Sequence, residues 1–147
     1  MGHDWIGRTF TTRGRTVTEA DLVLFSGLTW DVNAAHTDAV AASELPFGER
    51  VAHGTLVMSM ALGLAVVDGP SFPWRAGLSL EWQFRRPVRI GDTIHTEWSI
   101  QDVEGTKNPD VVRVTSECLV RNQRNEVVQK GTVVRLAANS EFSAGSP

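Results

Sequence analysis

The residues of this chain that can carry out chemistry are concentrated in one short segment, residues 28–38. Asp31, Asn33 and His36 can hold water or move protons there, and Trp30 places an indole beside them. On a regular helix Asp31 and His36 would lie about 140° apart, because each residue turns the helix by about 100°. They can share one water molecule only if the chain folds back between them, and Asn33 can support such a turn by bonding its own backbone. A solvated loop with an asparagine turn is the alternative.

The second candidate feature is Gly54, which opens a long apolar run. A glycine lets a ligand approach the backbone closely, and the first N–H groups of a helix have no partner within the helix. Together with the helix dipole, these groups can stabilise negative charge that develops on an oxygen atom. The alternative is that Gly54 only begins a helix in a crowded core.

Ser59 is a further candidate on the same run, one helical turn after Thr55 and on the same face. Hydroxyl groups inside helices usually bond back to a carbonyl group, and no Gly-x-Ser-x-Gly motif surrounds this serine. We therefore predict that Ser59 lines or orients a pocket and does not act as a nucleophile.

Three arginines, Arg85, Arg86 and Arg89, follow a predicted strand. They can bind phosphate groups, or they can form an ordinary charged surface, which is the commoner role of arginine. His36 and His53 lack the cysteines or the third ligand of a usual zinc site, so no metal is expected.

These residues need elements that bring them together, and the two halves of the chain differ in pattern. In the first half, residues 18–21 resemble a capping box that opens a short helix as far as Gly27, whereas residues 29–51 show no sustained period. The run Thr55–Val67 is apolar on nearly every face, so as a helix it should be buried all round.

The second half of the chain alternates apolar and polar residues with a period of two, which is typical of half-buried strands. The pattern predicts strands at residues 78–84, 94–101, 111–121 and 126–136. Gly131, inside the last of them, suggests a bulge. An antiparallel sheet that curls its apolar face around the one apolar helix satisfies both patterns. The sequence therefore predicts an α+β hot-dog fold, whose open sheet edges favour a homodimer.

The length and composition limit the class of protein. A chain of 147 residues, with 41% hydrophobic and 21% charged residues, fits one soluble domain. We place that domain at residues 1–137, followed by a flexible tail at residues 138–147. A net charge of −3 gives no electrostatic footprint for nucleic acid or an anionic membrane, and no apolar stretch is long enough to span one. The single cysteine, Cys118, fits a reducing compartment, so a cytoplasmic location is expected.

The combined motifs resemble those of the MaoC-like, or (R)-specific enoyl-CoA hydratase (hydratase 2), family. The pattern of that family is Gly-Asp-x-Asn-Pro-x-His, a small residue six positions later, and Ala-His-Gly before the central helix. The residues in register with it are Asp31, Asn33, His36, Ala42 and Ala52-His53-Gly54. Ser59 and the run Arg-Pro-Val-Arg-Ile-Gly-Asp-Thr extend the resemblance, which covers about residues 16–136.

Three positions depart from the family pattern. Trp30 stands where the family usually has glycine, Ala34 where it has proline, and Ala35 where it has a larger aliphatic residue. Losing the proline loosens the turn between Asp31 and His36. Trp30 can either narrow the acyl channel or fill core space that the two alanines leave. No reacting group is lost, so the departures bear on substrate range more than on reaction type.

The resemblance implies an enzyme that interconverts trans-2-enoyl thioesters and (R)-3-hydroxyacyl thioesters by adding or removing water. It implies that Asp31 and His36 hold the water, that the Gly54 N–H stabilises the thioester oxygen, and that Asn33 orients the loop. The partner is an acyl group on coenzyme A or acyl carrier protein, and no cofactor is needed. Residue types do not determine whether Asp31 or His36 is the base, because coupled groups titrate together.

Two other functions remain compatible with the sequence. A hot-dog thioesterase would use Asp31 to activate water at the carbonyl carbon, although His36 in register favours hydration. A non-catalytic acyl-thioester-binding subunit of a heterodimer is favoured by Ala34 and Ala35 and opposed by the intact Asp31 and His36. An assay that separates loss of the double bond from release of free thiol distinguishes all three.

Overall fold

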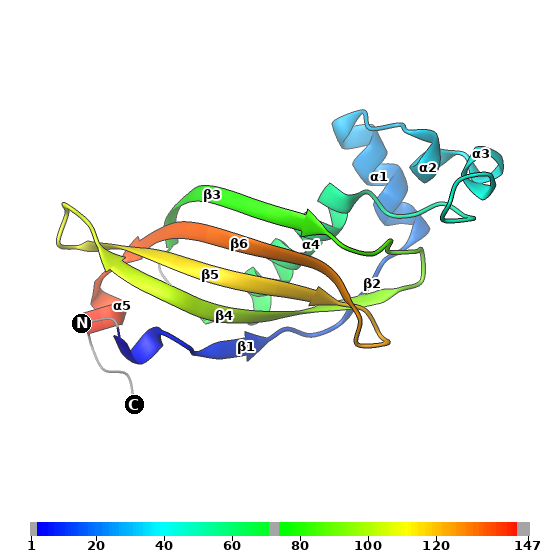
Figure 1. Cartoon of the computed structure of the whole chain (residues 1–147). Coiled ribbons are helices and arrows are strands. Elements are labelled where there is room, and N and C mark those ends of the chain that lie inside the picture. The colour runs from blue at the N-terminus through cyan, green and yellow to red at the C-terminus, as the bar shows by residue number, and fades with distance from the viewer. Residues whose placement is uncertain (1–2, 71–73, 144–147) are drawn as a thin grey trace.

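The structure of the chain, a computed structural model, describes residues 3–70 and 74–143 (Figure 1). The helices are α1 (Glu19–Thr29), α2 (Ala34–Thr37), α3 (Ala39–Ser43), α4 (Gly54–Asp68) and α5 (Ser140–Ser143), with a 3-10 turn at His3–Trp5. The strands are β1 (Thr9–Thr11), β2 (Arg15–Thr16), β3 (Trp74–Phe84), β4 (Thr93–Gly105), β5 (Val111–Arg121) and β6 (Val127–Ala138). The long strands, α1 and α4 are those that the sequence predicts, whereas α2 and α3 are not.

The strands form one six-stranded antiparallel sheet in the order β1-β4-β5-β6-β3, and β2 also pairs with β4. Successive side chains of a strand point to opposite faces, and β4 shows the result. Ile94, Thr96, Trp98 and Ile100 are buried, while the residues between them are only half-buried. The buried face is the one that α4 lies against (Figure 1). The predicted hot-dog arrangement of a sheet around a central helix is confirmed.

The helix α4 supplies the centre of the core. Its buried residues are Leu56, Val57, Met60, Ala61, Leu64 and Ala65. They belong to one apolar cluster with Trp98, Val120 and Val133 of the sheet. The other side of the helix is open, since Val66 and Val67 are 77% and 62% exposed. The prediction that this helix is buried all round is wrong for the single chain, because the sheet covers only the side that faces it.

The glycine in β6 has a different role from the predicted one. Gly131 pairs regularly with Cys118 in β5 and with Trp82 in β3, so the predicted bulge at this residue is wrong. A Cβ atom on residue 131 would lie 1.9 Å from Cε3 of the Trp82 indole. The glycine therefore leaves room for this ring on the inner face of the sheet, a close approach that any larger residue would prevent.

The helices α1, α2 and α3 form a lobe at one end of the sheet (Figure 1). α1 begins with the predicted capping box, in which Thr18 and Asp21 each accept the backbone N–H of the other. α2 and α3 are single turns whose first N–H groups are capped by the side chains of Asn33 and Asp38. Helices this short carry no apolar stripe, so the hydrophobic period could not reveal them.

α1 ends at Trp30, whose φ of 63° lies in the left-handed region. The side chain of Trp30 is 86% exposed, so in the single chain it neither fills the core nor lines an acyl channel. A left-handed residue at the end of a helix is usually glycine, because glycine has no Cβ to clash. This geometry fits glycine, the residue that the resembled motif has at this position.

Replacing Trp30 by glycine is therefore expected to raise the free energy of unfolding by about 1 kcal/mol, because the left-handed conformation costs other residues roughly 1–2 kcal/mol. Trp30→Ala is the matched control, since it removes the same indole but keeps the Cβ atom, and it should leave stability nearly unchanged. Urea denaturation of both variants measures the difference. If glycine stabilises no more than alanine does, the strain assigned to Trp30 is absent.

The chain packs beyond residue 137, where the sequence analysis ended the domain. Phe142 of α5 is buried, and its ring lies 5.4 Å from that of Trp5. The packed domain thus extends at least to Ser143, and residues 144–147 of the expected tail lie outside the described residues. Within the described ranges, no helix is long and apolar enough to cross a membrane.

Candidate active site

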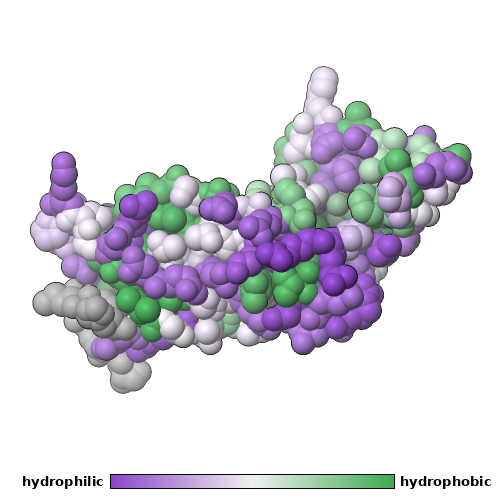
Figure 2. All heavy atoms as spheres, viewed as in Figure 1, coloured by the Kyte–Doolittle hydropathy of each residue, from purple (hydrophilic) through white to green (hydrophobic). Residues whose placement is uncertain are grey.

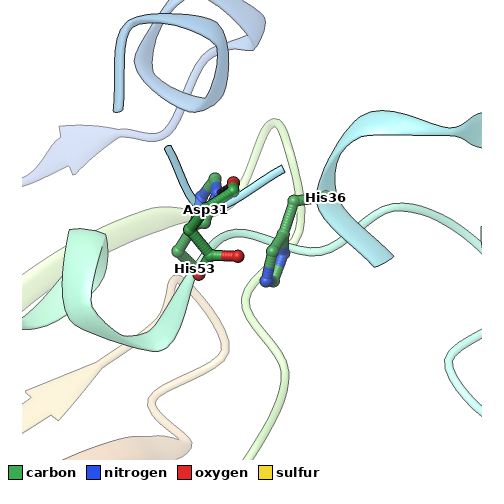
Figure 3. A group of neighbouring side chains, drawn as sticks. All are labelled: Asp31, His36 and His53. Atoms are coloured by element: carbon green, nitrogen blue, oxygen red, sulfur yellow. Dashed lines mark hydrogen bonds between the residues drawn. The ribbon is translucent and has the colours of Figure 1, made fainter. Parts of the chain in front are cut away.

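The chain folds back between Asp31 and His36, as the sharing of one water molecule requires. The Asn33 side chain makes the turn, because its oxygen accepts the N–H of Ala35 at 3.0 Å and caps α2. Asp31, His36 and His53 then come together, and their candidate ligand atoms all lie within 4.8 Å of one another. Figure 3 shows these three side chains converging from the lobe and from the segment before α4.

Asp31 and His36 line a pocket of about 420 Å³. The start of α4 contributes Gly54, β6 contributes Gln129, and the end of β3 with the segment after it contributes residues 84–88. The pocket therefore lies where the lobe meets the central helix and the edge of the sheet. The sequence singled out residues in all three parts of this wall: the segment with Asp31, the start of α4, and the arginines that follow the strand ending at Phe84.

One hydrogen bond determines which ring nitrogen of His36 is the acceptor. Nδ1 lies 2.7 Å from the carbonyl oxygen of Val51. A carbonyl oxygen only accepts, so Nδ1 must carry the proton and donate it. In the neutral ring Nε2 is then the acceptor. His36 can therefore take a proton at Nε2 while Val51 keeps the ring oriented.

His53 is buried behind this pair and ties two segments together. Its Nε2 lies 3.0 Å from the carbonyl oxygen of Asp31 and 3.1 Å from Oγ of Ser26, and its ring stacks on His36 with a centroid distance of 3.9 Å. Since the carbonyl of Asp31 accepts, Nε2 carries the proton. Nδ1 has no hydrogen-bond partner among the described residues. This pattern suits a neutral histidine that holds the Asp31 loop against the start of α4.

Burial lowers the pKa of His53 below that of an ordinary histidine, although the hydrogen bond to Asp31 opposes the shift. In the unfolded chain His53 takes up a proton at about pH 6.5, whereas in the folded protein it resists protonation. The free energy of unfolding should therefore fall as the pH drops from about 7 to 5. Asparagine at position 53 cannot titrate, so His53→Asn should show a shallower fall. Urea denaturation across this range compares the two proteins, and equal slopes would contradict the assignment.

The start of α4 offers backbone donors to the pocket. His53 precedes the helix without a side-chain cap, and the N–H groups of Gly54 and Thr55 have no acceptor within the described part of the chain. Both residues line the pocket. Phe84 packs on Gly54 so closely that a Cβ atom there would lie 2.8 Å from the ring. Unpaired N–H groups at the positive end of a helix suit an oxygen that becomes negative.

Three of the residues predicted for the site, Asn33, Ser59 and Trp30, do not line the pocket, although Asn33 makes the turn that positions His36. Ser59 donates its hydroxyl to the carbonyl of Thr55 at 2.8 Å, as expected for a helical serine, but it lines a separate hollow on the open side of α4. In the single chain Ser59 thus does not line the pocket of Asp31 and His36, and a role for it in substrate binding stays a prediction. Trp30 is exposed and does not line the pocket.

Gln129 and Phe84 were not predicted as site residues from the sequence, and no role was predicted for His53. The signal for His53 was present in the Ala-His-Gly motif, and the signal for Gln129 was an amide at an inward position of a strand. β6 carries valine and alanine on both faces, however, so its sequence does not reveal which positions point inward. Phe84 carried no signal, because it continues the apolar alternation of its strand.

The arrangement places two acceptors, the Asp31 carboxylate and Nε2 of His36, beside the backbone donors of α4. Two acceptors can hold one water molecule and take its proton, and the donors can stabilise an oxyanion. Asp31, His36 and His53 also form a set of two imidazoles and one carboxylate that can ligate a divalent cation.

The sequence profile of the MaoC like domain family matches residues 3–122. The chain belongs to this family. The resemblance predicted from the motifs of the sequence is thereby confirmed.

Two curated relatives match this chain over part of their own length. The chain is 46% identical over 89 residues to Protein MaoC of Klebsiella aerogenes, which covers 60% of this chain and 26% of that protein. It is 35% identical over 82 residues to the (R)-specific enoyl-CoA hydratase of Rhodospirillum rubrum, which covers 54% of this chain and 55% of that protein. The chain thus spans about a quarter and about half of the lengths of these relatives.

The fold of this MaoC-like chain agrees with a solved structure. The crystal structure of the MaoC-like dehydratase from Rhodospirillum rubrum superposes with a TM-score of 0.83 at 29% identity. The match covers 90% of this chain and 92% of that one. The lobe, the central helix and the sheet are therefore shared over almost the whole domain.

Proposed function

We propose that this protein adds water to trans-2-enoyl thioesters and removes it from (R)-3-hydroxyacyl thioesters. The observation that carries the proposal is the convergence of Asp31 and His36 beside the free N–H groups of Gly54 and Thr55 in one pocket. Similarity to a protein named (R)-specific enoyl-CoA hydratase and to a MaoC-like dehydratase supports the reaction class.

In the hydration direction, a single water molecule donates two hydrogen bonds, one to the Asp31 carboxylate and one to Nε2 of His36. His36 takes a proton as the water oxygen attacks C3 of the enoyl group, and the electrons of the double bond move toward the thioester oxygen. The N–H groups of Gly54 and Thr55 stabilise that oxygen, and the proton is then delivered to C2. Such a proton transfer contributes about 10²–10⁴-fold, and an oxyanion donor about 10²–10³-fold. The bond from His36 to Val51 supports His36 as the base.

The residues that line the outer part of the pocket support coenzyme A as the carrier. Arg85 and Arg86 belong to the pocket, and guanidinium groups bind phosphate oxygens in pairs. Arg86 also lies 4.0 Å from Glu126, and Arg89 forms an ion pair with Glu49. We therefore assign phosphate binding to Arg85 and Arg86 as part of the proposal, and the ordinary surface role to Arg89.

A ladder of trans-2-enoyl-CoA substrates, from four carbons upward, tests the function. Absorbance reports loss of the double bond, and a thiol reagent reports release of coenzyme A. A hydratase removes the double bond without releasing thiol, whereas release of thiol would indicate a thioesterase. Neither change, despite binding of the thioester, would indicate a non-catalytic subunit. A chelator should leave turnover unchanged if Asp31, His36 and His53 act on water alone.

We also propose that the protein is a homodimer. β3 is an edge strand in which Leu78, Leu80 and Phe84 are each about half exposed, and Val66 of the neighbouring α4 is more so. Figure 2 shows apolar residues along the rim of the sheet where β3 lies and on the lobe. An unpaired edge with exposed apolar side chains favours pairing with a second chain. Light scattering at micromolar concentration should give the mass of two chains, and a monomer mass would contradict the proposal.

A further inference from the structure

Gln129 carries a hydrogen-bonded amide in the apolar interior that the reaction above does not use. It lies on the inner face of β6 and is 2% exposed. Its Oε1 accepts the Nε1–H of Trp82 at 2.8 Å, and its Nε2 donates to the carbonyl oxygen of Gly54 at 2.9 Å. A buried amide costs free energy unless its groups are paired, and here it joins β3, β6 and the first residue of α4.

The two partners of Gln129 allow only one orientation of its amide. An indole N–H only donates, so it must face the amide oxygen. A backbone carbonyl only accepts, so it must face the amide nitrogen. Rotation of the amide by half a turn would break both bonds at once. The Gly54 carbonyl is therefore held by a donor of fixed position.

Trp82 is itself held in place by the neighbouring strand. Its ring occupies the space that a side chain at Gly131 would fill, with Cε3 and Cζ3 at 1.9 and 2.1 Å from the position of a Cβ atom there. Trp82 and Gly131 are paired in register, as are Phe84 and Gln129. The sequence thus combines a glycine, an indole and an amide into one rigid support under the start of α4.

The Gly54 carbonyl belongs to the same peptide group as the N–H of Thr55. A hydrogen bond to the carbonyl fixes the plane of that group and polarises it, which strengthens the N–H as a donor. A carbonyl in the first turn of a helix already accepts the N–H four residues later, so the helix itself does not need Gln129. The additional buried bond therefore acts on the peptide group that lines the pocket.

We propose that Gln129 is a positioning residue. With Trp82, it orients the first peptide group of α4 so that the Thr55 N–H, beside that of Gly54, faces the thioester oxygen. The catalytic part of this inference rests on the proposed function. The geometric part, the effect of Gln129 on the Thr55 amide, stands without it.

Three variants test the proposal. Gln129→Met removes both hydrogen bonds at similar volume, and Trp82→Phe keeps an aromatic ring but removes the indole donor to Oε1 of Gln129. Asn122→Ala is the matched control. Asn122 is also a buried amide, in the turn between β5 and β6, and it does not line the pocket. Its oxygen accepts the N–H groups of Arg124 and Glu126, and its nitrogen donates to the Glu126 carboxylate.

Kinetics with an enoyl-CoA substrate give the first readout. In Gln129→Met, kcat should fall roughly 10–10²-fold while KM changes less than about twofold, because misplaced donors affect the transition state more than substrate binding. Trp82→Phe should lower kcat by a smaller factor. Asn122→Ala should lose stability and keep its kcat. An equal loss of kcat in Asn122→Ala would show that Gln129 only stabilises the fold.

The backbone amide signal of Thr55 in nuclear magnetic resonance gives a second readout that needs no catalysis. It should move upfield in Gln129→Met, move less in Trp82→Phe, and stay in place in Asn122→Ala. An unchanged Thr55 signal in Gln129→Met would overturn this inference and leave the proposed function standing. A wild-type protein that hydrates no enoyl thioester would overturn the catalytic part together with the proposed function, while the Thr55 signal would still decide the geometric part.

Discussion

Asp31→Asn and His36→Ala are each expected to lower the rate of hydration by at least about 10²-fold, because each removes one of the two acceptors that hold the water. Asp31 is exposed, and among the described residues its side chain makes one long hydrogen bond, 3.4 Å, with the N–H of Asn33. Asp31→Asn should melt close to the parent protein. His36→Ala also loses the hydrogen bond to Val51 and the stack on His53, so it should melt somewhat lower. The loss of turnover should exceed what this change in stability accounts for.

Because both side chains act on one water molecule, the double variant should be little worse than either single one. Asp38→Asn is the matched control. Asp38 lies in the same lobe and accepts the N–H groups of Val40 and Ala41, a role that asparagine can keep. Turnover near that of the parent protein in either Asp31→Asn or His36→Ala would refute the water-holding pair.

Gly131→Ala is expected to lower the free energy of unfolding by about 1–3 kcal/mol, the usual cost of overpacking a core. The new methyl group would overlap the rigid ring of Trp82, which cannot move without leaving the inner face of the sheet. When the ring moves, Gln129 loses its indole partner. The variant should therefore also lose activity, by a factor similar to that of Trp82→Phe.

Gly77→Ala provides the comparison for this prediction, because Gly77 lies in β3 and a Cβ atom there would meet nothing within 4 Å. Urea denaturation and turnover should both separate the two variants. If alanine at position 131 is tolerated as well as alanine at position 77, the ring of Trp82 is not held as described.

The parts of the fold that the sequence predicted are those with a long hydrophobic period. β4 alternates buried and half-buried residues along Thr93–Ile100, and the unbroken apolar run before Asp68 could only be a core helix. In the lobe, α2 and α3 escaped prediction because Asn33 and Asp38 build these short helices through caps, which leave no period. The open side of α4 escaped as well, because composition alone does not tell how much of a helix the sheet will cover.

The candidate site divides in the same way. Asp31, His36 and Gly54 were predicted because they fall within a motif whose residue types are unusual together. Gln129 was not, because its importance depends on two partners, Trp82 and Gly54, that are distant in sequence and become neighbours only through strand pairing. The helical spacing of Ser59 gave the face on which it lies, but not which hollow of the surface that face would line.

The position of β3 in the sheet bears on how the protein folds. β3 follows α4 in the chain, yet the strand with which it pairs is β6, the last to be synthesised. The pairing of Trp82 with Gly131 joins two strands that are separated in the chain by all of β4 and β5. Closing so long a segment costs conformational entropy before any contact offsets it, unless β4 and β5 have already paired. We expect the meander of β4, β5 and β6 to form first and β3 to dock last. Hydrogen exchange measured during refolding should then show that the amides of β3 become protected after those of β5. The bond between Trp82 and Gln129, which supports the start of α4 beside Asp31 and His36, would form in this final step of folding.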